Sequence, residues 1–446
     1  MSPIKRRIFV KAGLASSVIG FPSLGHAIGA NDRVQIALIG CGGRGTQVAS
    51  SLASRSDVVC TQLCDIHEER MVRTADFISK QQGGRKPLLA TQMGEVFTNK
   101  DVDAVVVATP DHWHTPAAIL ACQAGKDVYV EKPFSHNIWE GRKLVEAARK
   151  YKRVVQVGTQ NRSAPYNLAA RDYIQSGKLG EIRLVKVFNL KGGGPFHLGA
   201  SGQAPSGFPW KTWLGPAKAR PYHSKIFHGG WHNYWDYSGG DLADCGIHQL
   251  DLTIMVLGDP ATPNSVSASG GRLQHKGDDG EVPDVEILHY DYPEFVMTFE
   301  HSHFANSMSK INGKIRSGDQ FPYWPQCATR IEFYGTKGNM MLGRHGGGWQ
   351  VFTSGGRVVE EQYGRHSDPE HQQNFVDCIR NRKRPNADVG LAHGSTTIMH
   401  MGNIAHRVGN QKLHFDAETE RFIGNDAANL LVKRQNVTPY SVKEMV

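Results

Sequence analysis

The sequence lacks the marks of several protein classes. Its seven cysteines are odd in number and include no Cys-x-x-Cys pair, so neither a disulfide framework nor a zinc site is expected. No apolar stretch reaches the roughly 20 residues that a membrane-spanning helix needs. Charged residues make up only 21% of the chain, which is ordinary for a soluble protein. These absences favour a soluble globular protein with small, buried cysteines.

Positive charge is concentrated at one end of the chain. The sequence has 51 Lys and Arg against 42 Asp and Glu, an excess of +9. Four of the basic residues lie within residues 1–30, which contain no acid, and without them the balance is 47 against 42, or +5. Because the remainder has no Lys/Arg block, we expect no nucleic-acid partner.

Residues 1–30 have the organisation of an export signal peptide. Lys5-Arg6-Arg7 precedes a short apolar run over residues 12–24, and small residues follow around Ala27. The paired arginines with Phe9 and Lys11 resemble a twin-arginine signal. An ordinary secretory signal and a basic disordered start remain alternatives. We therefore expect twin-arginine export machinery as a partner, cleavage near Ala27, and a periplasmic or otherwise exported protein without a membrane span.

The length of 446 residues predicts two domains beyond the signal, because single cores stop growing near roughly 250–300 residues. Strands alternate with helices through residues 31–158, which predicts a doubly wound parallel sheet of the Rossmann type. One of these helices is expected over residues 116–124. Residues 159–446 contain many strands and few helices between them, which predicts an α+β domain with an open, largely antiparallel sheet closed by helices over residues 368–381 and 391–408. The expected fold class is α/β.

A dinucleotide-binding motif follows the first predicted strand. The strand over residues 34–39 runs into Gly40-Cys41-Gly42-Gly43-Arg44-Gly45, a G-x-G-x-x-G, and a helix follows. Gly40 permits the turn, Gly42 lets the backbone approach a pyrophosphate, and Gly45 lets the helix pack on the strand. Asp65 ends the next strand, where it can bind both ribose hydroxyls and repel a 2′-phosphate. The sequence therefore predicts NAD rather than NADP as cofactor.

Ligands of such sheets bind at the carboxyl ends of the strands. Several polar or strand-ending residues fall there, and with the glycine-rich loop they form the predicted cofactor contacts: Gly40, Gly42, Gly43, Arg44, Gly45, Asp65, Thr109, Pro110, His114, Glu131, Lys132 and Gln160.

The second half carries one informative segment, Gly239 to Asp251. If it is helical, Asp244, His248 and Asp251 stand at i, i+4 and i+7, on one face. A carboxylate one turn from an imidazole can orient it and raise its basicity, as a general base requires. A helix-capping aspartate beside a structural histidine is an equally good interpretation of the spacing alone.

Taken together, the motifs resemble those of a known family. Gly40 to Gly45, the run Thr109-Pro110-Asp111-His112-Trp113-His114, Glu131-Lys132-Pro133 and the segment 239–251 are similar to the Gfo/Idh/MocA oxidoreductases over nearly all of the chain after the signal. The resemblance implies a Rossmann domain and a second domain whose sheet forms one wall of a sugar or cyclitol site, often with an oligomer interface. We therefore expect a homo-oligomer.

The resemblance also implies catalytic roles. Lys132 would lie near the nicotinamide ribose and the reacting hydroxyl, where its charge would stabilise a developing alkoxide. His248 would be the general base, and Asp244 would position the substrate hydroxyl or tune His248. These three residues are the predicted catalytic set.

Substrate contacts are expected from Trp113, Arg162, Tyr234, Asp244 and His248. Aromatic faces stack on sugar C–H surfaces, and charged or imidazole groups bind hydroxyls. The chain has 21 histidines, several of them clustered around residues 112–114 and 223–232. For most of these aromatic and histidine side chains taken singly, packing in the core and loops is the stronger interpretation. No histidine pair has metal-ligand spacing on a clear helix or strand, so no metal is expected.

Three functions are compatible with these features. The first is an NAD-dependent oxidoreductase that acts on a sugar, glycoside or cyclitol, with NAD bound tightly because free NAD is not expected outside the cytoplasm. The second is a redox-neutral NAD-dependent glycosidase that oxidises the sugar transiently. The third is a non-catalytic sugar-binding module, which the intact catalytic set makes the weakest interpretation.

Overall fold

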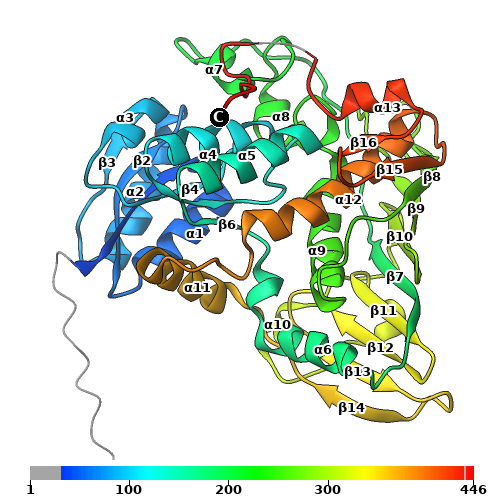
Figure 1. The fold of residues 1–446 in the computed structure, drawn as a ribbon. Coiled ribbons are helices and arrows are strands. Elements are labelled where there is room, and N and C mark those ends of the chain that lie inside the picture. The colour runs from blue at the N-terminus through cyan, green and yellow to red at the C-terminus, as the bar shows by residue number, and fades with distance from the viewer. Residues whose placement is uncertain (1–31, 436–437) are drawn as a thin grey trace, which may run out of the picture.

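The computed structural model describes residues 32–435 and 438–446. The predicted signal peptide and its cleavage near Ala27 lie outside the described residues. Two β-sheets stand side by side, and helices fill the space between them (Figure 1). The predicted combination of a Rossmann sheet with a largely antiparallel second sheet is confirmed.

The first sheet has six parallel strands in the order β3-β2-β1-β4-β5-β6. Its strands are short, and the central ones are apolar and buried on both faces, as expected when helices cover both sides of a sheet. The chain order reverses between β1 and β4, and such switch points are where doubly wound sheets bind ligands. The strands are β1 (Val34–Ile39), β2 (Val58–Cys64), β3 (Leu88–Ala90), β4 (Ala104–Val107), β5 (Asp127–Val130) and β6 (Val155–Val157).

The helices that cover this sheet are α1 (Gly43–Ala53), α2 (Glu68–Gln81), α3 (Met93–Thr98), α4 (Asp111–Gln123) and α5 (Ile138–Lys150). The prediction for α4 was wrong at its start, because the helix begins at Asp111 and contains Pro116 in its interior. Proline favours the first turn of a helix, which is why the sequence suggested a start at Pro116. The earlier start places Asp111 at the helix N-terminus, next to the end of β4.

The second sheet has ten strands in the order β14-β13-β12-β11-β7-β10-β9-β8-β15-β16. Only β7 and β10 run parallel among its strand pairs. The strands are β7 (Ile182–Leu190), β8 (Ser265–Gly271), β9 (Val285–Asp291), β10 (Val296–Ser302), β11 (Arg330–Gly335), β12 (Gly338–Gly343), β13 (Trp349–Phe352), β14 (Val358–Gln362), β15 (Leu413–Asp416) and β16 (Arg421–Phe422). Strand β14 was not predicted from the sequence, and its Val-Val-Glu-Glu-Gln shows no alternation of buried and exposed residues.

Two helices from the second half connect the sheets. Phe375 of α11 (Asp368–Asn381) packs into the same core as β1 and β2. Helix α12 (Val389–Arg407) places Val389 in the core of the first domain and Met401 in the core of the second sheet. In Figure 1 α12 runs between the two sheets. The division at residues 158 and 159 remains a prediction, since α11 and the start of α12 pack on the first domain.

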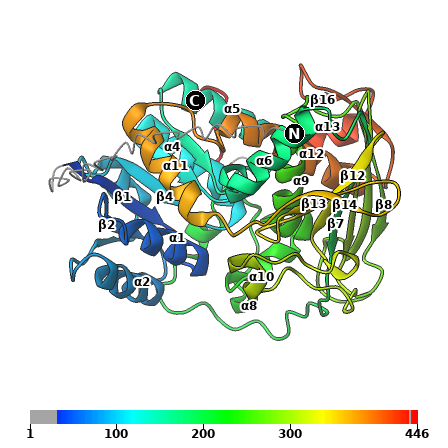
Figure 2. The same ribbon diagram turned by 90° about the horizontal axis from the view of Figure 1, so that it is seen from below.

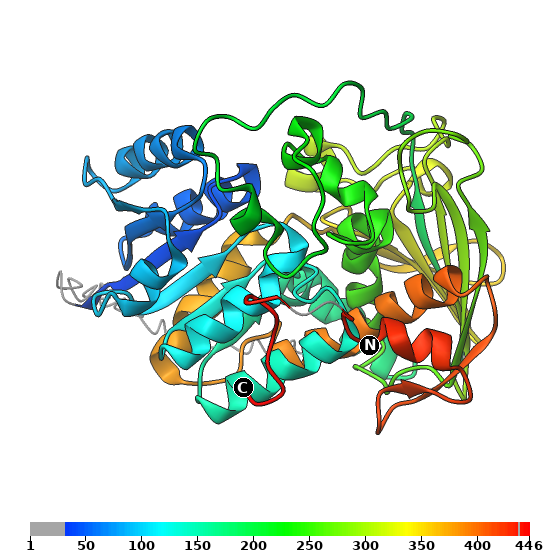
Figure 3. The ribbon, with the colours of Figure 1, turned by 90° about the horizontal axis from the view of Figure 1, so that it is seen from above.

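The chain between the end of β7 and the segment 239–251 crosses from the second sheet to the carboxyl ends of the first (Figures 2 and 3). This stretch is called the crossing segment below. It contains α7 (Trp210–Leu214) and α8 (Ser224–Phe227), and its aromatic rings form a core of their own around Trp213, Phe227 and Tyr237. The ring of Phe227 stacks on His67 of the first domain at 5.5 Å. The segment thus covers the ligand-binding edge of the Rossmann sheet.

The remaining described helices are short or lie against the second sheet: α6 (Pro165–Gln175), α9 (Ile247–Val256), α10 (Gly313–Ser317) and α13 (Asp426–Leu431). Within residues 32–435 and 438–446, no helix is both long and apolar enough to cross a bilayer. All seven cysteines are buried and unbonded, as the sequence predicted.

Candidate active site

A cavity of about 770 Å³ opens at the carboxyl ends of the Rossmann strands. Its floor comes from the ends of β1, β2, β4 and β5, and its roof comes from the crossing segment and the C-terminal Tyr440. It brings together most of the predicted cofactor contacts: Gly40, Gly42, Gly43, Arg44, Asp65, Thr109, Pro110, His114, Glu131 and Lys132.

The glycine-rich loop has the geometry that its sequence predicts. Gly40 has a φ of +98°, and a Cβ there would lie 2.5 Å from the carbonyl oxygen of Ala108. A Cβ on Gly45 would collide with the carbonyl oxygen of Gly40, so this glycine lets α1 pack against the turn. Gly42 precedes α1 and lines the cavity, and a Cβ there would meet no protein atom within 4 Å. The backbone of this loop is therefore open to a ligand at the helix N-terminus.

Two buried polar atoms lack partners where a nicotinamide dinucleotide would lie. Thr109 Oγ1 and His114 Nε2 make no hydrogen bond within the described chain, and both residues line the cavity. His114 is fixed by a 2.7 Å contact between Nδ1 and the carbonyl oxygen of Pro133. Unpaired buried polar atoms are costly unless a ligand or water satisfies them. The residues present therefore fit a polar cofactor.

Asp65 lies at the far end of the cavity. Its carboxylate accepts hydrogen bonds from the backbone N–H of Cys41 at 2.6 Å and of His67 at 2.8 Å. Burial raises the pKa of Asp65, although these two N–H groups oppose the shift. Arg70 and Arg73 line the same part of the cavity. The glycine-rich loop and Asp65 are thus held together by a direct hydrogen bond.

Arg44 ties the glycine-rich loop to two other elements. Its Nε contacts Glu131 Oε1 at 2.8 Å, and its Nη1 contacts Asp368 Oδ2 at 3.2 Å at the start of α11. Burial opposes the charge, but Glu131 outweighs it and raises the pKa of Arg44. The role of Arg44 seen here is to position Glu131 and the loop.

Lys132 and Asp244 form an ion pair between the two halves of the chain. The ammonium of Lys132, just after β5, donates to the carbonyl oxygen of Asp244 at 2.7 Å and to its Oδ1 at 2.8 Å. Although burial opposes its charge, Asp244 and then Asp111 raise the pKa of Lys132. Burial would raise the pKa of Asp244, but Lys132 and His232 lower it. Both groups are therefore charged near neutral pH, and both line the cavity.

Asp111 was not assigned a role from the sequence, although it lies in the Thr109–His114 run. It is 4% exposed, borders the cavity, and accepts a hydrogen bond from Ser238 Oγ at 2.6 Å. Burial raises its pKa to about 7, against the opposing charge of Lys132. A carboxyl group that titrates near neutral pH beside a buried lysine is suited to proton exchange. The position of Asp111 after the end of β4, where ligands of such sheets bind, is the feature by which the sequence could have identified it.

The segment 239–251 is not one regular α-helix. Leu242–Gly246 forms a π-helical turn, η4, before α9. A π turn shifts hydrogen bonding to i→i+5 and rotates the residues that follow relative to an α-helix. Asp244 reaches Lys132, whereas Asp251 is fully buried and pairs with Arg162 at 2.8 Å. The π turn therefore separates Asp244 from the regular spacing of His248 and Asp251, which both lie in α9.

His248 lies beyond the π turn, next to the ring of His345 at 4.6 Å. Burial and then Arg344 lower its pKa well below the usual value, so its imidazole is neutral. Its Nδ1 is buried without a partner in the described chain. A neutral ring with an unpaired nitrogen has the form that the predicted general base requires, although burial and Arg344 weaken its basicity.

Five predicted contacts do not line the cavity: Gly45, Gln160, Arg162, Tyr234 and His248. Arg162 is 1% exposed and pairs with Asp251 and Asp259, so its guanidinium holds the protein interior together. Gln160 donates to the hydroxyl of Tyr129. Tyr234 is buried in the aromatic core of the crossing segment, under the guanidinium of Arg220. The sequence shows that Arg162, Gln160 and Tyr234 are polar or aromatic. It does not show that other groups of the protein already make their contacts.

Trp113 does line the cavity, and so does His232, which the sequence had placed only in a histidine-rich stretch. Trp113 is buried, and its indole N–H donates to the carbonyl oxygen of Trp213 at 2.9 Å. The ring of His232 lies against that of its neighbour Trp231 at a tilt of 31°, and burial lowers the pKa of His232 despite the nearby Asp244. An aromatic and imidazole wall therefore faces the Lys132–Asp244 pair.

Comparisons with known proteins agree with this site. Residues 34–159 match the family described as "Oxidoreductase family, NAD-binding Rossmann fold", and residues 192–319 and 331–442 match its "C-terminal alpha/beta domain". The chain is 24% identical over 338 residues to a scyllo-inositol 2-dehydrogenase (NAD(+)) of Bacillus subtilis, covering 69% of this chain and 82% of that protein. It is 31% identical over 180 residues to a Glycosyl hydrolase family 109 protein of Solibacter usitatus, covering 39% of this chain and 41% of that protein.

Solved structures show the same fold. The WlbA dehydrogenase of Bordetella pertussis, in complex with NADH and UDP-GlcNAcA, superposes with a TM-score of 0.61 at 19% identity, over 86% of this chain and 99% of that one. The two family matches cover most of the chain and include the glycine-rich loop, Lys132 and Asp244. The protein is therefore an NAD-binding enzyme that belongs to the Gfo/Idh/MocA oxidoreductase family.

Proposed function

We propose that this enzyme oxidises a hydroxyl group of a sugar, glycoside or cyclitol. The observation that carries the proposal is the position of the Lys132 ammonium, which lines the cavity. Two of its three N–H groups donate to Asp244. The third donor is available for a substrate oxygen. The inositol dehydrogenase named among the relatives supports a polyhydroxylated substrate.

Different residues of the chain serve cofactor binding, charge stabilisation and proton transfer in this proposal. Bound at the glycine-rich loop, NAD supplies the hydride acceptor. Lys132 donates to the reacting oxygen and stabilises its negative charge as the proton leaves. His248, neutral and with a free Nδ1, accepts that proton, while Asp244 keeps Lys132 oriented. Asp111 exchanges a proton with its surroundings close to neutral pH.

The test is a panel of sugars, glycosides and inositols with the purified protein and NAD, monitored by NADH absorbance. Substrate-dependent NADH formation that disappears in Lys132→Met supports the proposal. Failure of every polyol to reduce NAD, in a protein shown to bind NAD, would argue against it.

A redox-neutral glycosidase is the second candidate, because several relatives are named Glycosyl hydrolase family 109 proteins. Those matches cover less than half of either chain, with the shared portion at 39% and 38% of this one. Nitrophenyl glycosides separate the two functions. Release of nitrophenol without net NADH favours the glycosidase, whereas NADH without nitrophenol favours the dehydrogenase.

We also propose that NAD is preferred over NADP and that it is tightly bound. The preference rests on the Asp65 carboxylate, which lines the cavity and would repel a 2′-phosphate. Tight binding is supported by the roof of the crossing segment, whose Trp213, Phe227 and Trp231 line the same cavity. Acid denaturation of the purified protein should release about one nicotinamide dinucleotide per chain, and release of none would contradict tight binding.

Export and assembly complete the proposal. The N-terminal sequence supports passage through the twin-arginine machinery to the periplasm, which cell fractionation tests by comparing the wild type with Arg6→Lys/Arg7→Lys.

Homo-oligomer formation is supported by apolar residues on the outer face of the second sheet, such as Ile287 and Val296, which are 40% and 39% exposed. Light scattering after size exclusion measures the assembly directly.

A further inference from the structure

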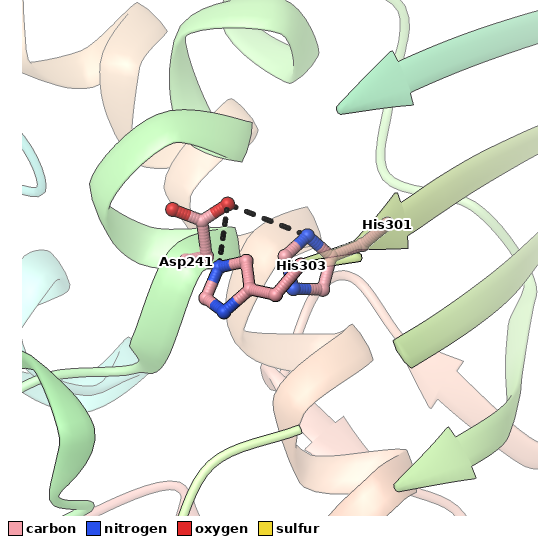
Figure 4. A group of neighbouring side chains, drawn as sticks. All are labelled: Asp241, His301 and His303. Carbon is pink, nitrogen blue, oxygen red and sulfur yellow. Dashed lines mark ion pairs between the residues drawn. The ribbon is translucent and has the colours of Figure 1, made fainter. Parts of the chain in front are cut away.

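A second cluster of polar side chains lies beside the catalytic ion pair, on the side of the second sheet. Asp241 directly precedes the π turn (Figure 4). His301 lies near the end of β10, and His303 directly follows that strand. Figure 4 shows both imidazoles pointing at the Asp241 carboxylate. His301 Nδ1 and His303 Nε2 each lie 3.4 Å from the same atom, Asp241 Oδ2.

These distances are long for a charged hydrogen bond, which is usually 2.7–2.9 Å. They match the edge of a metal tetrahedron, because two ligands bonded to Zn²⁺ at about 2.0–2.1 Å lie about 3.4 Å apart. The three ligand atoms all lie within 4.8 Å of one another. Two imidazole nitrogens and one carboxylate oxygen form a ligand set typical of catalytic zinc, which keeps a fourth position open.

The surroundings of the cluster are those of a metal ligand set. Lys191 contacts the other oxygen of Asp241, and the side-chain amide of Asn189 contacts Oδ2, so the carboxylate is held in place from behind. Hydrogen-bonded carboxylates are usual around protein-bound metals. His301 is buried, with 3% of its surface exposed, so the protein holds its imidazole in place. His303 is only partly buried, with 22% of its side chain exposed, which leaves a path for an ion.

We propose that Asp241, His301 and His303 form a site for a divalent transition-metal ion, with Zn²⁺ as the best fit. The sequence predicted no metal because the two histidines are separated by one residue at a strand end and their carboxylate lies sixty positions earlier. A carboxylate oxygen of Asp241 lies within 4.8 Å of ligand atoms of Asp244 and Cys245. The ion therefore sits next to the residue that holds Lys132.

The competing explanation is a metal-free ion-pair cluster in which Lys191 alone neutralises Asp241. The two explanations differ in what the protein binds, which can be measured without any turnover. The full-length enzyme is stripped with a chelator, titrated with Zn²⁺ by calorimetry, and analysed for metal after gel filtration. We expect one Zn²⁺ per chain, a higher melting temperature on zinc addition, and, with Co²⁺ in its place, the visible absorption of a four-coordinate ion.

Three variants define the site. His303→Gln and Asp241→Asn should each lower zinc affinity at least about tenfold, the effect expected for loss of a ligand. His289→Gln, an exposed histidine on neighbouring β9, is the matched control and should bind zinc like the wild type. Melting temperatures measured without zinc show whether each variant is folded. No stoichiometric binding to the wild type, or equal binding by wild type, His303→Gln and Asp241→Asn, would overturn the metal site. Either result leaves the proposed oxidation, which is tested by NADH formation, unaffected.

Discussion

Replacing Lys132 by methionine tests the catalytic geometry most directly. The change keeps a long side chain but removes the ammonium that donates to Asp244 at 2.7 and 2.8 Å and that has a third N–H for the substrate. Loss of one positioned donor to a developing oxyanion costs about 10²–10³-fold in kcat, or about 2.7–4 kcal/mol. The unpaired Asp244 carboxylate then faces the same oxyanion and adds repulsion. We therefore expect kcat to fall about 10³-fold, at the upper end of that range.

The assay is single-turnover reduction of NAD, with NAD affinity measured separately by calorimetry. NAD affinity should change by less than about threefold, because the glycine-rich loop and Asp65 hold the other end of the cofactor. Lys178→Met, an exposed lysine of the second domain, is the control and should leave kcat unchanged. A Lys132→Met enzyme whose kcat stays within about fivefold of the wild type would refute the assigned role.

Three further predictions follow from individual side chains. Because burial raises the pKa of Asp111 to about 7, its carboxylate form gains population as the pH rises through that value. The rate of oxidation should therefore rise through about pH 7, and Asp111→Asn should remove this inflection from the kcat/KM profile. Asp65→Ala removes the charge that opposes a 2′-phosphate, so the ratio of kcat/KM for NADP over NAD should rise at least about tenfold, or about 1.4 kcal/mol. Arg162→Met leaves Asp251 buried and unpaired, which should lower the free energy of unfolding by about 3–5 kcal/mol, as measured in urea, while Arg162→Met/Asp251→Leu recovers part of the loss.

The nucleotide-binding half could be predicted from the sequence because its signals are local. The glycine-rich loop, the strand before it and Asp65 lie within about thirty residues, and each glycine has a steric reason that the structure reproduces at Gly40 and Gly45. Strand ends of a parallel sheet meet at one edge, so the order of strands along the chain was enough to place Thr109 and Lys132 at the cavity.

For the second half, the family resemblance gave Lys132, Asp244 and His248 as a set, but it assigned Asp244 to the substrate hydroxyl or to His248 rather than to Lys132. Lys132 and Asp244 are 112 positions apart, and no periodicity joins them. The α-helical spacing of Asp244, His248 and Asp251 was misleading because a π turn precedes α9. Arg162 looked like a ligand-binding residue because sequence does not show that Asp251 and Asp259 already neutralise it.

The Lys132–Asp244 ion pair joins the two halves of the chain. Lys132 follows β5 of the Rossmann sheet, whereas Asp244 belongs to the helix that packs on the second sheet. Their 2.8 Å contact therefore depends on how the two sheets are held together. Helix α12 spans both cores, and α11 presents Asp368 to Arg44 of the glycine-rich loop. Because a misplacement of about 1 Å can cost 10²-fold in rate, the packing of α11 and α12 sets catalytic geometry as directly as the residues that touch the substrate.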